Sequence, residues 1–203
     1  MERRHPRGGL IVAGLVVVAL LSQASTARAE VRLGLGLGVN SSWYSVSPEP
    51  PSLDGKTGVI AGGFLEVGLS RMFAVQPGLR YTQKGFASAG YDQTEHYVEV
   101  PLLVKAQFRA TAKVLPYVIA GPNLGYEAAS YYSVLAAGVL FEKLDVALDL
   151  GAGVTFEVSP RLNVFLQSCV SLGLVNVVDT SEHPDTSASS RGIQVSGGVS
   201  IRL

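Results

Sequence analysis

The feature that most constrains the fold of this chain is a two-residue alternation of apolar and polar side chains. Residues 73 to 85, FAVQPGLRYTQKG, show it clearly: from Val75 the odd positions carry Val, Pro, Leu and Tyr, and the even positions carry Gln, Gly, Arg, Thr and Lys. Alternate residues of a β-strand point to opposite faces, so this segment predicts a strand with one apolar face. What that face contacts decides the class of protein.

The same alternation recurs along the chain and predicts eight strands. They are expected at 31–43, 58–69, 73–85, 96–108, 115–126, 144–158, 162–174 and 192–203. Short connections alternate with long, mostly polar ones at 44–57, 85–95, 127–143 and 175–191. Outer-membrane barrels have an even number of antiparallel strands, short periplasmic turns and long external loops. The sequence therefore predicts an all-β fold, an eight-stranded antiparallel up-and-down transmembrane β-barrel.

The distribution of charge separates this fold from a soluble barrel, which would have the same period. A membrane barrel needs one parity of every strand to be free of charge. That holds in each predicted strand, as in the first, where the odd positions are Val31, Leu33, Leu35, Leu37 and Val39. The opposite parity mixes charges with many glycines, which leave space in a narrow lumen. Only 16% of the 203 residues are charged, against about 25% in soluble domains. We therefore expect the apolar face to contact outer-membrane lipid.

The N-terminal segment predicts export. Three arginines, Arg3, Arg4 and Arg7, precede the apolar run LIVAGLVVVALL and the small residues Ala27 and Ala29. This is the pattern of a secretory signal peptide, whereas a retained membrane helix needs about 20 apolar residues. We predict a signal peptide at 1–29, a barrel domain at 30–203 and residence in the cell outer membrane. Without residues 1–29 the chain keeps 12 basic and 15 acidic residues, a balance that disfavours nucleic acid as a partner.

Aromatic residues support the same threading. With the N-terminus in the periplasm, six aromatic side chains fall on the lipid-facing parity near the two ends of the strands. They are Trp43, Tyr81 and Tyr126 near the external end and Phe73, Phe108 and Phe156 near the periplasmic end. Aromatic girdles at both membrane interfaces are typical of outer-membrane barrels.

Ten charged residues are expected inside the barrel, five of each sign. They are Arg32, Glu66, Lys105, Glu157 and Arg202 in the periplasmic half, and Arg80, Lys84, Glu99, Asp145 and Asp149 in the external half. Each half holds both signs, so the charges can pair across the lumen and offset their desolvation. A selectivity ring normally carries one sign, which favours a lumen closed by ion pairs over a pore.

The segments GFLEVGLSRMFAVQPGLRYTQKG, YVEVPLLVKAQF and YVIAGPNLGY resemble the outer-membrane β-barrel domain family of porin-like proteins of Gram-negative bacteria. The resemblance extends over residues 31 to 203. It implies an eight-stranded barrel in the outer membrane, in a family defined by fold more than by activity. Some members, the PorT-like proteins, are accessories of protein secretion.

Three prolines fall inside predicted strands, where the missing N–H removes a ladder hydrogen bond. We expect a β-bulge at each of Pro77, Pro101 and Pro122, since bulges accommodate proline in a sheet. Cys169 falls on the lumen parity and is interpreted as a small filler.

No catalytic, cofactor or metal site is predicted. His96 has Glu95 and Asp92 nearby, but no motif places a serine with them, and the scattered histidines and Cys169 lack metal-ligand spacing. Three functions remain open: a structural barrel that displays external loops, a small-solute porin, and an accessory protein of an envelope or secretion assembly. The apolar, aromatic segment 127–143 favours the last, unless the fifth and sixth strands simply continue through it.

Overall fold

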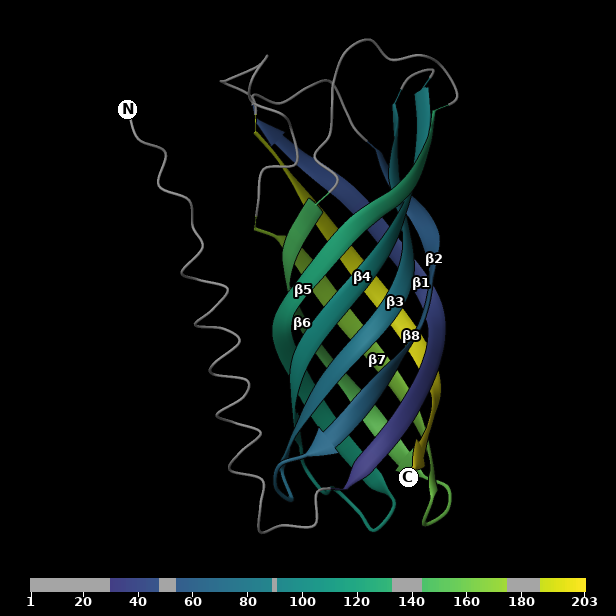
Figure 1. Ribbon diagram of the computed structural model, residues 1–203, viewed down its shortest axis with the longest axis vertical. Coiled ribbons are helices and arrows are strands. Elements are labelled where there is room, and N and C mark those ends of the chain that lie inside the picture. The colour runs from purple at the N-terminus through teal and green to yellow at the C-terminus, as the bar shows by residue number, and fades with distance from the viewer. Residues whose placement is uncertain (1–29, 48–53, 89–90, 133–143, 175–186) are drawn as a thin grey trace, which may run out of the picture.

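The computed structural model describes residues 30–47, 54–88, 91–132, 144–174 and 187–203, and the predicted signal peptide lies outside this range. These residues form a closed antiparallel barrel in which each strand pairs with the next and β1 pairs with β8. The strands are β1 (Val31–Ser47), β2 (Asp54–Gly68), β3 (Phe73–Ser88), β4 (Tyr91–Gln107), β5 (Val114–Tyr132), β6 (Leu144–Glu157), β7 (Leu162–Gly173) and β8 (Ser187–Arg202) (Figure 1). The predicted eight-stranded up-and-down barrel is confirmed.

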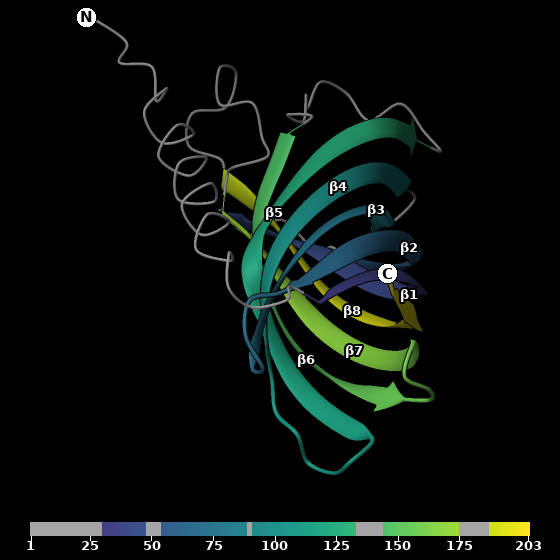
Figure 2. The ribbon, with the colours of Figure 1, turned by 60° about the horizontal axis from the view of Figure 1, so that its bottom comes forward.

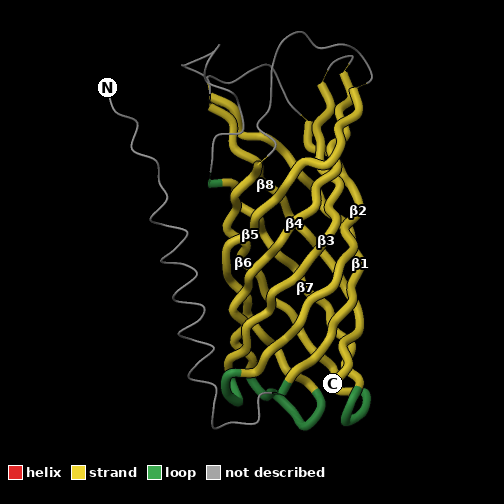
Figure 3. Tube along the Cα trace, viewed as in Figure 1, coloured by secondary structure: helices red, strands yellow, loops and turns green. Residues whose placement is uncertain are grey.

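The two ends of the barrel differ. Short turns join β2 to β3, β4 to β5 and β6 to β7 at the end that also carries the start of β1 and the C-terminal residue (Figure 3). Each of these turns is closed by backbone hydrogen bonds, such as Leu69 N to Phe73 O and Val158 N to Leu162 O. Because short turns lie on the periplasmic side of outer-membrane barrels, we take this as the periplasmic end. Among the described residues, no helix has the length and apolar character to cross a membrane.

The outward face is apolar over a continuous band. Leu35 is 59% exposed and Leu37 is 73% exposed, whereas their neighbours on the lumen parity face inward. In β4 the outward side chains from Val98 onward are followed by Phe108 in the turn, and all are uncharged. With a rise of about 3.4 Å per residue and a tilt of about 40°, that stretch spans about 25 Å, the height of the apolar band of an outer-membrane barrel. The oblique course of the strands is visible in Figure 2.

The strands are longer than predicted at the external end. Segment 85–95 was expected to be a loop, but β3 continues to Ser88 and β4 starts at Tyr91, with Lys84 paired to Glu95 and Gly85 to Thr94. The β5 strand continues to Tyr132, where it pairs with β4, while its pairing with β6 stops at Tyr126. The rest of segment 127–143 lies outside the described residues.

The expected bulges at the three prolines are wrong, because the register on both sides of each proline is the same. Cross-strand pairs are missing only toward the preceding strand: Pro122 still pairs with Leu148 of β6, and Pro77 with Leu102 of β4. A strand residue directs its single N–H to one neighbour, so a proline breaks one ladder and leaves the other intact. The register shifts instead lie between Gly55 and Ile60 and between His96 and Tyr97.

Candidate functional site: the barrel lumen

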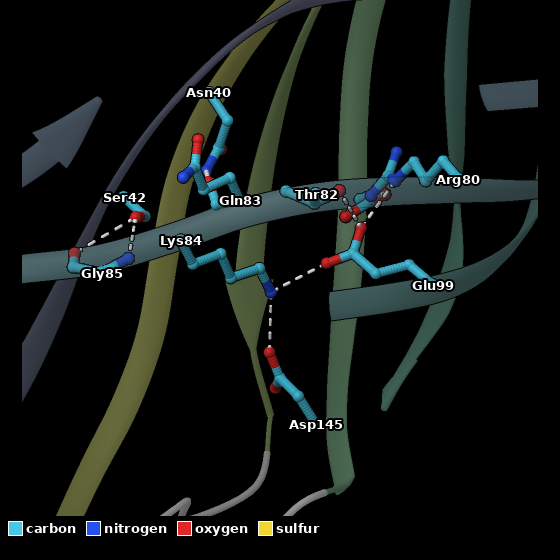
Figure 4. Close-up of polar contacts among 10 residues, drawn as sticks. Asn40, Ser42, Arg80, Thr82, Gln83, Lys84, Gly85, Glu99 and Asp145 are labelled. Atoms are coloured by element: carbon cyan, nitrogen blue, oxygen red, sulfur yellow. Dashed lines mark hydrogen bonds and ion pairs between the residues drawn. The ribbon is translucent and has the colours of Figure 1, made fainter. Parts of the chain in front are cut away.

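The external half of the lumen contains a network of buried ion pairs. Arg80 Nε lies 2.6 Å from Glu99 Oε2, and Arg80 Nη2 lies 2.7 Å from Asp149 Oδ2. Lys84 Nζ lies 2.8 Å from Glu99 Oε1 and 3.0 Å from Asp145 Oδ2. Glu99 therefore bridges the two cations (Figure 4).

Three strands position this network by their register. Arg80 and Lys84 lie on β3, Glu99 lies opposite Arg80 on β4, and the two aspartates reach across from β6. Glu99 and Asp149 are both fully buried. Glu99 contacts both cations, whereas Asp149 contacts Arg80 through Oδ2 and its buried Oδ1 makes no hydrogen bond within the described residues. Desolvating an ion costs several kcal/mol, and several short contacts per ion are what offset that cost. A network of this kind fixes the geometry of the lumen more than it stabilises the fold.

A second ion pair lies in the periplasmic half. Lys105 Nζ lies 2.8 Å from Glu66 Oε2, which also accepts a hydrogen bond from Gln76 Nε2 at 2.6 Å. The ammonium group stands over the ring of Tyr117, 4.4 Å from its centroid. Lys84 has the same arrangement with the Tyr97 ring at 4.5 Å. Each buried lysine thus combines a carboxylate with the negative face of an aromatic ring.

An apolar layer separates the two ion-pair levels. The Phe64 and Phe165 rings meet edge to face, with centroids 5.5 Å apart. They fit because the wall beside them is glycine: a Cβ on Gly34 would lie 2.3 Å from Phe64 Cζ, and one on Gly198 would lie 2.8 Å from Phe165 Cζ. Buried side chains of Leu103, Tyr117 and Ile119 form a hydrophobic cluster in the same lumen. The glycines of the lumen parity therefore leave room for two large rings.

Two cavities remain along the axis. A small one of about 70 Å³ lies at the aromatic layer and is lined by Phe64, Phe165 and the amides of Gln76, Gln167 and Gln194, among others. A larger one of about 610 Å³ opens at the periplasmic end. We call the second cavity the vestibule; its lining includes Glu30, Arg32, Glu66, Arg71, Gln107, Arg109, Leu115, Thr155, Glu157 and Asn163. The side chains of Glu66 and its partners close the inner end of the vestibule.

The ten predicted lumen charges do not all lie inside the lumen. Seven pair as described above, and Arg32 lies at the vestibule wall with Glu30. Two differ from the expectation: Glu157 stands at the vestibule mouth near Arg109, and the Arg202 side chain is 52% exposed. Both residues lie at the periplasmic end of their strands, where a long side chain reaches water and avoids the desolvation cost of the lumen.

Several lumen residues were missed by the search for charges. Glu95 is buried beside Gln93, and Tyr97, Tyr117, Phe64 and Phe165 fill the lumen between the ions. Each of them falls on the lumen parity of its strand. For Glu95 the charge on that parity was an available signal, whereas for the four aromatic residues parity indicated the facing but not the role. The six predicted girdle aromatics all lie on the outward face, Tyr126 with 53% and Phe108 with 49% exposure.

His96 and Glu95 point to opposite faces of β4. The Nδ1 atom of His96 contacts the Tyr81 hydroxyl on the outside of the barrel, while Glu95 is buried in the lumen. The side chain of Asp92 lies outside the described range. Cys169 is a free, buried thiol on the lumen parity. Within the described ranges, no cluster of three or more His, Cys, Asp or Glu residues could hold a metal ion.

Comparison with known proteins identifies the class of the protein. A sequence model of the outer membrane protein beta-barrel domain matches residues 22–179, which is more than half of the chain. The chain therefore belongs to this family and is an integral protein of the outer membrane. A search of the curated proteins finds no match.

Solved structures share the fold at low sequence identity. The chain is similar to Neisserial surface protein A (13% identity, TM-score 0.56, covering 84% of this chain and 97% of that one). It is also similar to OprG from Pseudomonas aeruginosa (10% identity, TM-score 0.57, covering 89% and 98%). The outer membrane protease OmpT from Escherichia coli matches with 6% identity and a TM-score of 0.50, covering 89% and 100%. At these identities the likeness concerns the fold alone.

Proposed function

We propose that this protein is a structural outer-membrane barrel that presents its external segments at the cell surface and does not conduct solutes steadily. The observation that carries the proposal is the sequence of levels across the lumen. From the external side these are the Lys84 and Arg80 ion pairs, the Phe64–Phe165 layer and the Lys105–Glu66 pair. Eight strands leave an interior only wide enough for side chains to fill, which is consistent with closure.

The charges also argue against a small-solute porin. A conducting ring concentrates one sign of charge around an open path. Here Glu66, Asp145 and Asp149 each contact a cation directly, and Glu99 contacts two. The charges are therefore used to satisfy each other and are not available to a permeating ion.

Planar-bilayer recording of the purified wild-type protein tests this function. We expect little or no steady conductance, because every level of the lumen is occupied. Large, stable single-channel steps from the wild type would reject the proposal and favour the porin.

Export and the absence of catalysis belong to the same proposal. We infer that the signal peptide is removed after Ala29, so N-terminal sequencing of the membrane protein should begin at Glu30; recovery in the soluble periplasm would contradict this. The side chain of His96 contacts Tyr81 on the outside of the barrel, away from the lumen and its carboxylates, which supports a non-enzymatic role.

A second candidate is a partner of an envelope or secretion assembly that binds through the external end. It is favoured by β5, whose residues 127–132 pair with β4 beyond the end of β6 and carry the aromatic segment outward. Affinity capture from outer membranes should recover a partner with the wild type and lose it when residues 130–141 are deleted. A deletion of the same length in another external segment, residues 175–186, serves as the control. A partner retained by both deletions would contradict this candidate.

A further inference from the structure

The periplasmic end of the barrel carries more cations than it can pair. Six basic side chains lie there, against two acidic side chains and the α-carboxylate of Leu203; the basic residues are Arg32, Arg71, Arg109, Lys113, Arg161 and Arg202. The two acidic side chains are engaged, Glu30 with Arg32 and Glu157 with Arg109. In the described part of the chain, the side chains of Arg71, Lys113 and Arg161 make no ion pair. The rim therefore has an unbalanced positive charge.

Two of these cations are held side by side at the corner between β7 and β8. The backbone N–H of Arg202 donates to the carbonyl oxygen of Arg161 at 2.9 Å, which brings the two residues together. A shallow hollow at this corner is lined by Pro160, Arg161, Arg202 and Leu203. The carboxylate oxygen Glu30 Oε2 is 4.0 Å from Arg202 Nη1, and the Arg202 side chain is 52% exposed. Both side chains are thus exposed at the periplasmic rim.

The hollow borders the apolar outer face through Leu203, which is 71% exposed and lies on the same strand parity as Ile201 and Val199. Ile201 and Val199 of β8 are each 44% exposed and pair with Leu162 and Val164 of β7. The outward side chains form a column that runs from the corner toward the middle of the membrane. A molecule with a charged head in the hollow would lay its hydrocarbon chain along this column.

We propose that the Arg161–Arg202 corner binds the phosphate of an anionic phospholipid in the periplasmic leaflet, with an acyl chain against Ile201 and Val199. One guanidinium group can donate two parallel hydrogen bonds to the oxygens of a phosphate. The corner lies at the end of the apolar band, which is the depth at which lipid headgroups are found. Basic side chains next to a bilayer gain free energy from anionic lipids. The site depends on membrane residence alone and stands apart from the question of conductance.

Native mass spectrometry tests the site. The folded protein is released from micelles that contain equal amounts of phosphatidylglycerol and phosphatidylcholine, and the lipid that stays bound is identified. We expect the wild type to retain phosphatidylglycerol in preference. The double variant Arg161→Gln/Arg202→Gln should lose the preference, by about fivefold for each arginine removed. The charge-preserving variant Arg161→Lys/Arg202→Lys should be intermediate, because an ammonium lacks the paired donors of a guanidinium.

The matched control is Arg71→Gln/Arg109→Gln, which removes two cations that line the vestibule from the same end of the barrel. It should keep the lipid preference. Equal loss in both double variants would overturn the site in favour of a general charge effect. If inorganic phosphate at the same concentration as the lipid displaced it, the ligand would be a free anion and the proposal of a lipid site would be wrong. Circular dichroism in the same micelles ensures that all variants compared are folded.

Discussion

The inward-facing glycines differ in how much space surrounds them. A Cβ on Gly198 would lie 2.0 Å from the backbone oxygen of Leu35, whereas one on Gly125 would meet its nearest atom, Tyr97 Cδ1, at 3.4 Å. The first contact is with the neighbouring backbone and cannot relax without moving β1 away from β8. We expect Gly198→Ala to lower the free energy of unfolding in lipid vesicles by several kcal/mol. This is at or above the usual cost of inserting an extra methyl group into a packed interior. Gly125→Ala should change it by less than about 1 kcal/mol.

Urea unfolding followed by tryptophan fluorescence measures both glycine variants. Equal losses in the two would show that alanine is excluded by strand twist in general and not by the close approach of β1 to β8.

The buried cation Lys84 allows a test of the external ion-pair network. Lys84→Met removes the partner of Asp145 and one of the two cations of Glu99. Breaking a buried pair from one side leaves an uncompensated charge and costs about 3–5 kcal/mol. The double variant Lys84→Met/Asp145→Asn should recover part of that loss, because it removes a carboxylate together with its cation.

The control for Lys84 is the exposed Lys113, where Lys113→Met should change the unfolding free energy by less than about 1 kcal/mol. The same vesicle unfolding assay applies to all three variants. A Lys84→Met variant as stable as the control would mean that water reaches the network and screens it.

At the scale of the strands, the position of each element was predictable inside the membrane and not beyond it. Within the bilayer one face meets lipid, so the apolar alternation reveals both the strand and its facing. Above the bilayer both faces of β3 and β4 carry mostly polar side chains, so the apolar alternation that marks a strand is lost where Ser88 pairs with Tyr91. The same loss of alternation hides the continuation of β5 from Tyr126 to Tyr132.

The candidate site was predictable in part for a related reason. Charge on the lumen parity led to Arg80, Lys84 and Glu99 because few charges can be buried elsewhere in such a barrel. Parity gives no depth, so it did not separate Arg202 at the rim from residues inside the lumen. It also gave no reason to choose Phe64 and Phe165, whose role depends on meeting across the lumen from β2 and β7.

The outer part of β5, residues 127–132, pairs with a single neighbouring strand among the described residues. Residues 117–126 pair with both β4 and β6, except that Gly121 and Pro122 pair with β6 only, while 127–132 pair, within the described ranges, with β4 alone. Alternate amides of a strand face opposite neighbours, so about half of those in 127–132 have no ladder acceptor among the residues that the structure describes. We expect hydrogen exchange in lipid nanodiscs to protect 115–126 strongly, with protection falling toward that of frayed termini in 127–132. Uniform protection up to Tyr132 would show a second partner strand on that edge.

For the molecule as a whole, the closed levels of the lumen lie in series. The Lys105–Glu66 pair, the Phe64–Phe165 layer and the Arg80–Glu99 pair each cross the same axis, and a solute must pass all of them. Conduction along such a path is limited by its tightest level. Removing one level therefore widens a cavity without connecting the two ends.

This arrangement predicts how the barrel can be opened. Lys105→Ala joins the vestibule to the space below the aromatic layer but leaves the Phe64 and Phe165 rings in place, so planar-bilayer recordings should remain quiet. Phe64→Ala/Phe165→Ala enlarges the cavity of about 70 Å³ but leaves ion pairs on both sides, and should also remain quiet. Only the combination of these substitutions with Arg80→Ala and Lys84→Ala should give channels, because it removes a closing side chain from every level. Folded protein, verified by circular dichroism, is recorded in each case. Steady channels from Lys105→Ala alone would contradict the series arrangement and place the whole barrier at the Lys105–Glu66 pair.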